Sequence, residues 1–345
     1  LERIRAEKTI RFHQALKWAA GLLCALGLGI AAFIHLNPGT EARELAARET
    51  AIRNGTEWLA AAQSDAGSWK AEEWGGQKKY TVGITGLALV SLLHAHDDPV
   101  EGPFAPHIAR AIDFLRSRQL PGGNYGDIYR TGLYNHAIAT LALLEAYRMQ
   151  PDDELKKSLD RAIHFTLNRK NGTAGWDYVA PRSPSNDSGG SFWPLMVLEQ
   201  ARHLGWRQVA DARDRGYLEL KQIIDASEPA GMLQTITAMS VWCFSDTGED
   251  TSGFEDRFFA NCETIIRGDD RSLDFYRSYF LAQGLASIQQ PDSRSLITRL
   301  QTDILKRQDA AGSWGVKDHW SSVGGKIYTT TMATMTLMVN DPGKI

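Results

Sequence analysis

The sequence predicts an all-α fold in which six helix pairs form two concentric rings. Three observations predict it. A corner sequence recurs, as QSDAGSW at residues 63–69 and as QDAAGSWG at residues 308–315. Beyond about residue 40, amphipathic helices alternate with nearly uncharged apolar helices. No stretch of useful length shows the alternation of apolar and polar residues that is typical of β-strands.

The first helix of each pair carries Arg, Lys and Glu on one face and apolar residues at i, i+3, i+4 spacing, as in AIRNGTEWLAAAQ. A helix of this kind packs one face on a core and leaves the other in water, so we expect these helices to form the outer ring. Their predicted ranges are Leu45–Gln63, Pro106–Gln119, Glu154–Asn168, Arg207–Asp225, Glu255–Arg267 and Arg294–Gln308.

The second helix of each pair is rich in Ala, Gly, Thr, Leu and Met, as in TVGITGLALVSLLHA. A helix that is apolar on all sides must be buried, so we expect these helices to form the inner ring. Their predicted ranges are Tyr80–Ala95, Arg130–Arg148, Ser191–Leu204, Met232–Phe244, Phe275–Gln289 and Ile327–Val339.

Four loops between a first and a second helix share a Gln or Asn, then Gly, then an aromatic residue. The glycine can adopt the left-handed conformation that ends a helix. The amide can bind carbonyl oxygens left open there, and the aromatic ring fills the joint between helix pairs. We therefore expect the corner rings to be mainly structural: Trp69, Tyr125, Trp176 and Trp314.

The first 44 residues differ from the rest. Residues 18–34 carry no charge and are preceded by several Arg and Lys residues. Such a run approaches the length that spans a bilayer, and the flanking charge places its start inside the cell. We expect a cytoplasmic segment (1–17), a transmembrane anchor (18–36), a linker (37–44) and a helix-pair domain (45–345) on the periplasmic side of a bacterial cytoplasmic membrane. The alternative is a cleaved signal peptide.

Composition and motifs exclude several classes of function. The net charge of −3 leaves no basic footprint for nucleic acid. The three Cys residues do not have the spacing of a zinc site. No nucleophile elbow, zinc-protease motif or phosphate-binding loop occurs. We therefore expect no metal and no other cofactor.

The entrances of the predicted inner helices carry a second repeat. The pattern Asp-x-Tyr-Arg ends in Tyr129-Arg130 and again in Tyr276-Arg277, and Tyr328 marks the last entrance. One interpretation is an N-cap with a local ion pair. The other is that these five residues line the mouth of the central cavity and hold a polar or anionic ligand.

Two further places are candidate binding sites. The third corner is the longest, and long loops on a rigid scaffold often carry binding residues. It places Trp176, Tyr178, Arg182 and Asp187 over the same mouth. His136 lies on a predicted inner helix, where it either faces the lumen or packs as a neutral hydrogen-bonded group.

The helix pairs and their Gln–Gly–Ser–Trp corners resemble the superfamily of squalene–hopene cyclases and protein prenyltransferase β-subunits, the α/α toroids. The resemblance covers about residues 45–340 and is best in residues 295–339. Within the superfamily the chain is most similar to bacterial membrane-anchored proteins with prenyltransferase/squalene-oxidase-type repeats. The resemblance implies an (α/α)6 toroid. The acidic Asp-x-Asp-Asp cluster of the cyclases and the zinc ligands of the prenyltransferases do not occur here.

These observations lead us to expect a membrane-anchored, non-catalytic toroid that serves as a binding or structural subunit of a cell-envelope complex. Its partners would be membrane lipid and other membrane-protein subunits. One alternative is an isoprenoid or terpenoid cyclase-like enzyme. The other is a glycan-active enzyme with paired carboxylates, drawn from Asp127, Asp187 and Asp274.

Overall fold

The structure is a computed structural model that describes residues 39–95, 98, 100–131, 133–169, 176, 188–226, 252–268, 273–288, 290–315 and 317–339. The chain divides into two compact units, residues 1–50 and 51–345. Of the first unit the structure describes residues 39–50, which include the first half of helix α2 (Thr40–Ala61). The following paragraphs concern the second unit.

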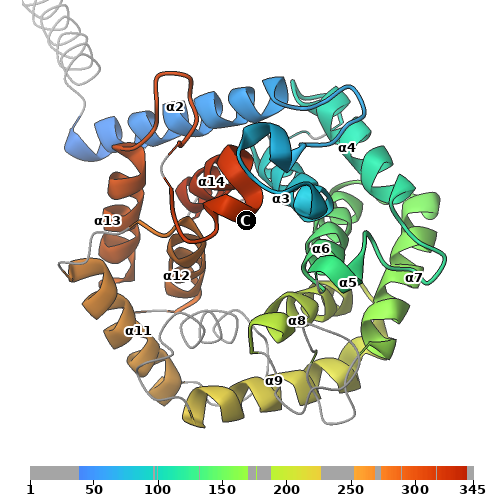
Figure 1. Ribbon diagram of the computed structural model, residues 1–345. Helices are drawn as coiled ribbons and strands as arrows, with labels where there is room; N and C mark the ends of the chain where they lie inside the picture. Colours follow the sequence, from blue (N-terminus) through green and yellow to red (C-terminus); the bar gives the residue numbers. More distant parts are fainter. Residues whose placement is uncertain are drawn as a thin grey trace, which may run out of the picture. The chain divides into compact units, whose positions relative to one another are not determined.

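Residues 51–345 form two rings of helices (Figure 1). The outer ring contains α2 from Ala51 onward, α4 (Ala105–Ser117), α7 (Asp153–Asn168), α9 (Ala210–Ala226), α11 (Ser252–Arg267) and α13 (Ser293–Leu305). The inner ring contains α3 (Thr81–His94), α6 (Tyr134–Met149), α8 (Ser188–His203), α12 (Phe275–Ser287) and α14 (Ser321–Met338). The described residues contain no β-strand, and the predicted all-α toroid is confirmed. The predicted inner helix at 232–244 lies outside the described residues.

The inner helices are buried on nearly all sides, as their composition predicts. In α14 every residue from Ile327 to Met338 is buried, although many are threonines. Thr334 Oγ1 donates to the Thr330 carbonyl at 2.8 Å, and Thr336 Oγ1 donates to the Met332 carbonyl at 2.7 Å. A hydroxyl that bonds its own helix in this way costs little on burial.

Each described Gln corner joins its own loop to the next outer helix. The Gln63 amide donates from Nε2 to the carbonyl of Gly67 at 3.0 Å and to that of His107, on α4, at 2.9 Å. Gln119 Nε2 likewise bonds Gly123 O and Ser158 O, on α7, and Gln308 Nε2 bonds Gly312 O and Ala51 O, on α2. The last of these contacts links the sixth helix pair to the first and closes the ring.

Glycine is required at these corners for two reasons. Gly67, Gly123 and Gly312 have φ values of 85°, 96° and 88°, which residues with a side chain rarely adopt. A Cβ on Gly312 would also lie 2.7 Å from the Asn54 carbonyl oxygen on α2. The corner can therefore touch the neighbouring backbone only because it has no side chain.

The corner tryptophans close the joint from inside. Trp69 and Trp314 are fully buried. Their Nε1 atoms donate to the carbonyls of Leu59 at 2.6 Å and Ile304 at 2.8 Å, which belong to or adjoin the last turn of the preceding helix. The predicted structural role of these two rings is confirmed.

The predicted membrane anchor at residues 18–36 lies outside the described residues, so it stays a prediction. In the part of the chain that the structure describes, no helix has both the length and the apolar character needed to cross a bilayer.

We predict that Gly312→Ala destabilises the fold by about 3 kcal/mol, because it adds a clash with Asn54 to the strain of a positive φ. Gly205→Ala is the matched control, since Gly205 has φ 98° and open space around its Cβ. It should cost only about 1 kcal/mol. Denaturant unfolding of both variants measures the difference. Equal losses would show that the corner does not depend on contact with the next helix.

Candidate functional site

Two carboxylates lie at the entrances of the neighbouring inner helices α12 and α14. Asp274 caps α12 by accepting the Arg277 N–H at 2.8 Å. Asp318, in the loop before α14, accepts the Phe275 N–H on its Oδ2 at 3.0 Å. Because Phe275 directly follows Asp274, this bond holds the two carboxylates beside one another. We call Asp274, Asp318, Tyr276, Tyr328 and Trp320 the carboxylate site.

The environment of Asp318 raises the pKa of its carboxyl above the usual value. Burial raises the pKa of the Asp318 carboxyl, and the negative charge of Asp274 raises it further. Hydrogen bonds from the Phe275 N–H, the Tyr328 hydroxyl at 3.2 Å and the Trp320 N–H oppose this effect without cancelling it. Burial and the neighbouring carboxylates also raise the pKa of Tyr328 well above its usual value, so its hydroxyl remains a donor.

Aromatic rings from three elements adjoin the two carboxylates. Tyr276 lies 6.0 Å from Trp320, 4.7 Å from Phe280 and 6.3 Å from Trp193, measured between ring centroids. Trp193 comes from α8, so the ring contacts run from α8 through Tyr276 on α12 to Trp320 in the loop before α14. In the described part of the chain, Trp320 Nε1 is buried and has no hydrogen-bond partner.

The loop that carries Asp318 is fixed at both ends. Asp318 Oδ1 accepts the Trp320 N–H at 3.0 Å. This bond forms a local turn of the kind that short acidic side chains favour. Farther on, Gly325 interrupts α14 with φ 63°, and a Cβ there would lie 2.3 Å from the Trp74 carbonyl oxygen. The Gln77 N–H donates to the Val323 carbonyl at 2.9 Å. The first turn of α14 is thus held against the segment before α3.

The structure brings some of the sequence-predicted site residues together. Tyr276 and Tyr328 both belong to the carboxylate site, whereas Arg277 lines a separate cavity between α11, α12 and α13. Tyr129 and Arg130 lie on the short helix α5 (Ile128–Thr131). The remaining loop candidates, Tyr178, Arg182 and Asp187, lie outside the described residues.

His136 and Trp176 are parts of corners. The Tyr125 N–H donates to His136 Nδ1 at 3.3 Å, which leaves Nε2–H to donate to Thr166 Oγ1 at 2.8 Å. Equivalent corner N–H groups bond threonine hydroxyls, with Trp69 on Thr85 and Trp314 on Thr330. Trp176 is fully buried, and its Nε1 donates to the Thr166 carbonyl at 2.9 Å. Both rings therefore contribute to packing of the helix pairs.

Sequence reasoning missed Asp318, although a signal was present. The entrances of two inner helices read Asp-Ile-Tyr at 127–129 and Asp-Phe-Tyr at 274–276. Asp-His-Trp at 318–320 has the same Asp-x-aromatic form ahead of α14. Within the residues that the structure describes, no three His, Cys, Asp or Glu side chains are grouped so that they could hold a metal ion.

No protein-family model matches the chain. Its fold is similar to that of several solved enzymes. An inactive variant of an α-1,6-mannanase from Salegentibacter sp., in complex with α-1,6-mannotriose, is 11% identical at a TM-score of 0.63, over 85% of this chain and 98% of that one. An unsaturated glucuronyl hydrolase specific for heparin is 12% identical at 0.61, over 87% and 98%. The type II terpene cyclase MstE from Scytonema is 12% identical at 0.57, over 87% and 99%.

These similarities show an α/α-toroid fold, and they are not specific to squalene–hopene cyclases or prenyltransferase β-subunits. They also correct one expectation. The prediction of a non-catalytic binding or structural subunit is wrong on this comparison, because the solved structures that share the fold are enzymes. It rested on missing cyclase and zinc motifs, and a toroid can carry catalytic groups in other positions.

We predict that His136 makes the fold acid-sensitive. Burial lowers the pKa of His136 from 6.5 to about 3, so between these values the unfolded chain binds a proton that the folded chain does not. The free energy of unfolding should therefore fall as the pH is lowered through this window.

His136→Thr, which copies the threonine of the other corners, should reduce this pH slope, whereas His164→Thr, at an exposed position, should leave it unchanged. Denaturant unfolding at several pH values tests this. If the free energy of unfolding of His136→Thr had the same pH slope as that of the unchanged protein, the His136 ring would have to take up a proton as readily in the folded chain as in the unfolded chain.

Proposed function

We propose that this chain is an enzyme that cleaves glycosidic bonds at the carboxylate site. One observation supports this more than any other: Asp318, with its raised pKa, lies beside a second carboxylate, Asp274. Glycosidic cleavage needs one carboxyl that gives a proton to the leaving oxygen and another that acts as base or nucleophile. Asp318 fits the first role, and Asp274, at the N-terminus of α12, fits the second.

The surrounding rings suit a sugar ligand. Tyr276 and Trp320 offer aromatic faces on which the apolar face of a pyranose can stack. The buried Trp320 Nε1, which has no partner among the described residues, offers a donor for a sugar hydroxyl. The Salegentibacter mannanase and the glucuronyl hydrolase, which share the fold, are glycan-active enzymes, and this agrees with the proposal.

A second candidate is an acid-initiated isoprenoid cyclase. A carboxyl with a raised pKa can protonate an alkene, aromatic faces beside it can stabilise the cation that forms, and the type II terpene cyclase shares the fold. We place it second because Asp318 lies beside another carboxylate, Asp274, and glycosidic cleavage uses such a pair.

The cellular location of the enzyme is also part of the proposal. The uncharged run at residues 18–34 supports an N-terminal anchor that holds the enzyme on the periplasmic side of a bacterial cytoplasmic membrane. Membrane lipid and neighbouring membrane-protein subunits would then be its surroundings.

We predict that Asp318→Asn and Asp274→Asn each lower glycan cleavage by about 100-fold or more, since each removes a group needed in the transition state. Asp113→Asn, on the exposed face of α4, is the control and should keep full activity. Release of reducing ends from a panel of neutral and uronic-acid oligosaccharides is the measurement.

The outcome separates the two candidates. Loss of activity in both Asp variants supports the paired-carboxylate mechanism. Conversion of a polyprenyl substrate without any glycan cleavage, abolished by Asp318→Asn alone, would replace it with the cyclase mechanism.

A further inference from the structure

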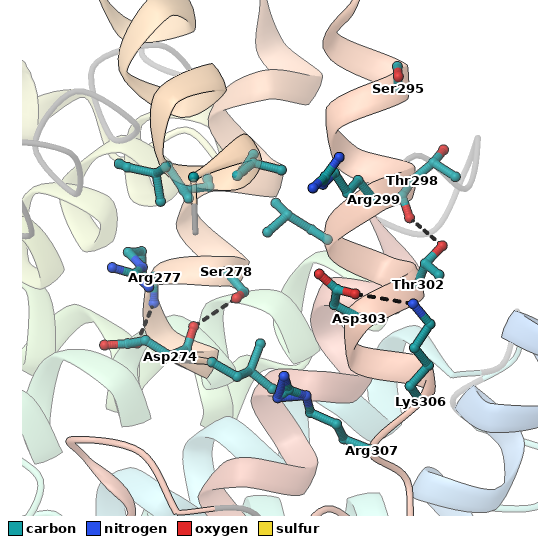
Figure 2. Close-up of a pocket in the computed structure, with 16 residues that line it drawn as sticks. Asp274, Arg277, Ser278, Ser295, Thr298, Arg299, Thr302, Asp303, Lys306 and Arg307 are labelled. Atoms are coloured by element: carbon teal, nitrogen blue, oxygen red, sulfur yellow. Dashed lines mark hydrogen bonds and ion pairs between the residues drawn. The ribbon is translucent and has the colours of Figure 1, made fainter. Parts of the chain in front are cut away.

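A concave site lies between the end of α11, the first turns of α12 and the length of α13 (Figure 2). Its volume is about 650 Å³, within the range of cavities that hold a small-molecule ligand. Asp274 lines this cavity and also belongs to the carboxylate site, but the other lining residues take no part in that site.

The polar wall of the cavity is basic. It contains four basic side chains, Arg277, Arg299, Lys306 and Arg307, against the two carboxylates of Asp274 and Asp303. Arg299 and Asp303 are four residues apart on α13, so they share one helix face, and Arg307 follows two residues after the end of that helix. Figure 2 shows these side chains with Arg277 across from them on α12.

Both carboxylates in the wall already have partners. Lys306 Nζ lies 3.4 Å from Asp303 Oδ1, and Asp274 Oδ1 accepts the Arg277 backbone N–H at 2.8 Å. Within the described residues, neither Arg299 nor Arg307 forms an ion pair with a carboxylate. Two guanidinium groups therefore line a shared space, and neither forms an ion pair with a carboxylate of the described residues.

Most of the remaining lining is apolar or hydrogen-bonded within its own helix. Ile265, Leu281 and Leu300 supply an apolar surface. The Ser278 hydroxyl donates to the Asp274 carbonyl at 2.7 Å, and the Thr302 hydroxyl donates to the Thr298 carbonyl at 2.8 Å. The arrangement suits a ligand with a compact anionic group and an apolar or neutral body.

We propose that this cavity binds a phosphate group, carried by a small molecule or by a lipid. Guanidinium groups match the oxygens of phosphate in pairs, and a doubly charged anion balances the excess of two basic groups over acidic ones. This proposal does not depend on glycan cleavage, because Arg299, on the outer helix α13, and Arg307, just after it, take no part in the carboxylate site.

The first test is calorimetric titration of the purified full chain with inorganic phosphate, pyrophosphate and glycerol 3-phosphate. The second is co-sedimentation of the chain with phosphatidylcholine vesicles that either contain or lack phosphatidic acid. The double variant Arg299→Gln/Arg307→Gln removes both guanidinium groups. The control, Arg294→Gln/Arg215→Gln, removes two exposed arginines that do not line the cavity, so both variants change the net charge equally.

We expect saturable binding that weakens with salt and falls by about tenfold or more in the cavity variant but not in the control. Binding of the soluble phosphates alone identifies a small-molecule ligand, and binding of acidic vesicles alone identifies a lipid headgroup. Three outcomes overturn the proposal. They are the absence of saturable binding in every arm, equal losses in both variants, and tighter binding of a dicarboxylate such as succinate than of phosphate. Circular dichroism spectra and unfolding midpoints of both variants separate lost binding from lost folding.

Discussion

The contact between each corner and the backbone of the next outer helix is the constraint on which the toroid depends. A helix pair on its own leaves one flank of its inner helix uncovered, and only a neighbour can bury it. The Gln63 amide bonds its own loop and α4 at once, so neighbouring pairs are fixed in both height and rotation. Glycine at position 67 permits this approach, because a Cβ would lie 2.2 Å from the Arg110 carbonyl oxygen.

This fixed register explains why the aspartates before α12 and α14 lie beside one another. The entrances of α12 and α14 are neighbours in the ring, and each is preceded by an aspartate in an Asp-x-aromatic sequence. An aspartate before a helix is ordinarily a solvated cap. Here the N–H of Phe275 bonds Asp318 across the joint, and Tyr328 bonds it from within α14. A local capping device thus becomes part of a half-buried pair of neighbouring carboxylates.

The sequence predicts the helices and their layers well, because periodicity and charge report directly on burial. It also places Tyr276 and Tyr328 at the entrances of inner helices, and the two residues lie close enough to interact electrostatically. It does not predict that Gln63 reaches His107 or that Asp318 reaches Phe275, since both contacts join segments far apart in the chain. His136 shows the reverse problem. Its residue type points to chemistry, but its place is the one that Thr85 and Thr330 occupy in other corners.

The contact between the first and last helix pairs affects how the chain folds during synthesis. Gln308 bonds the carbonyl of Ala51, and Gly312 packs on Asn54, so the first and last helix pairs complete each other. During synthesis the flank of α2 that receives this corner stays uncovered until Gln308, 257 residues after Ala51, has left the ribosome. Contacts between such distant segments slow folding, because a long loop must be ordered before they form. A nascent chain of this kind is exposed to aggregation at that one seam until its final helix arrives.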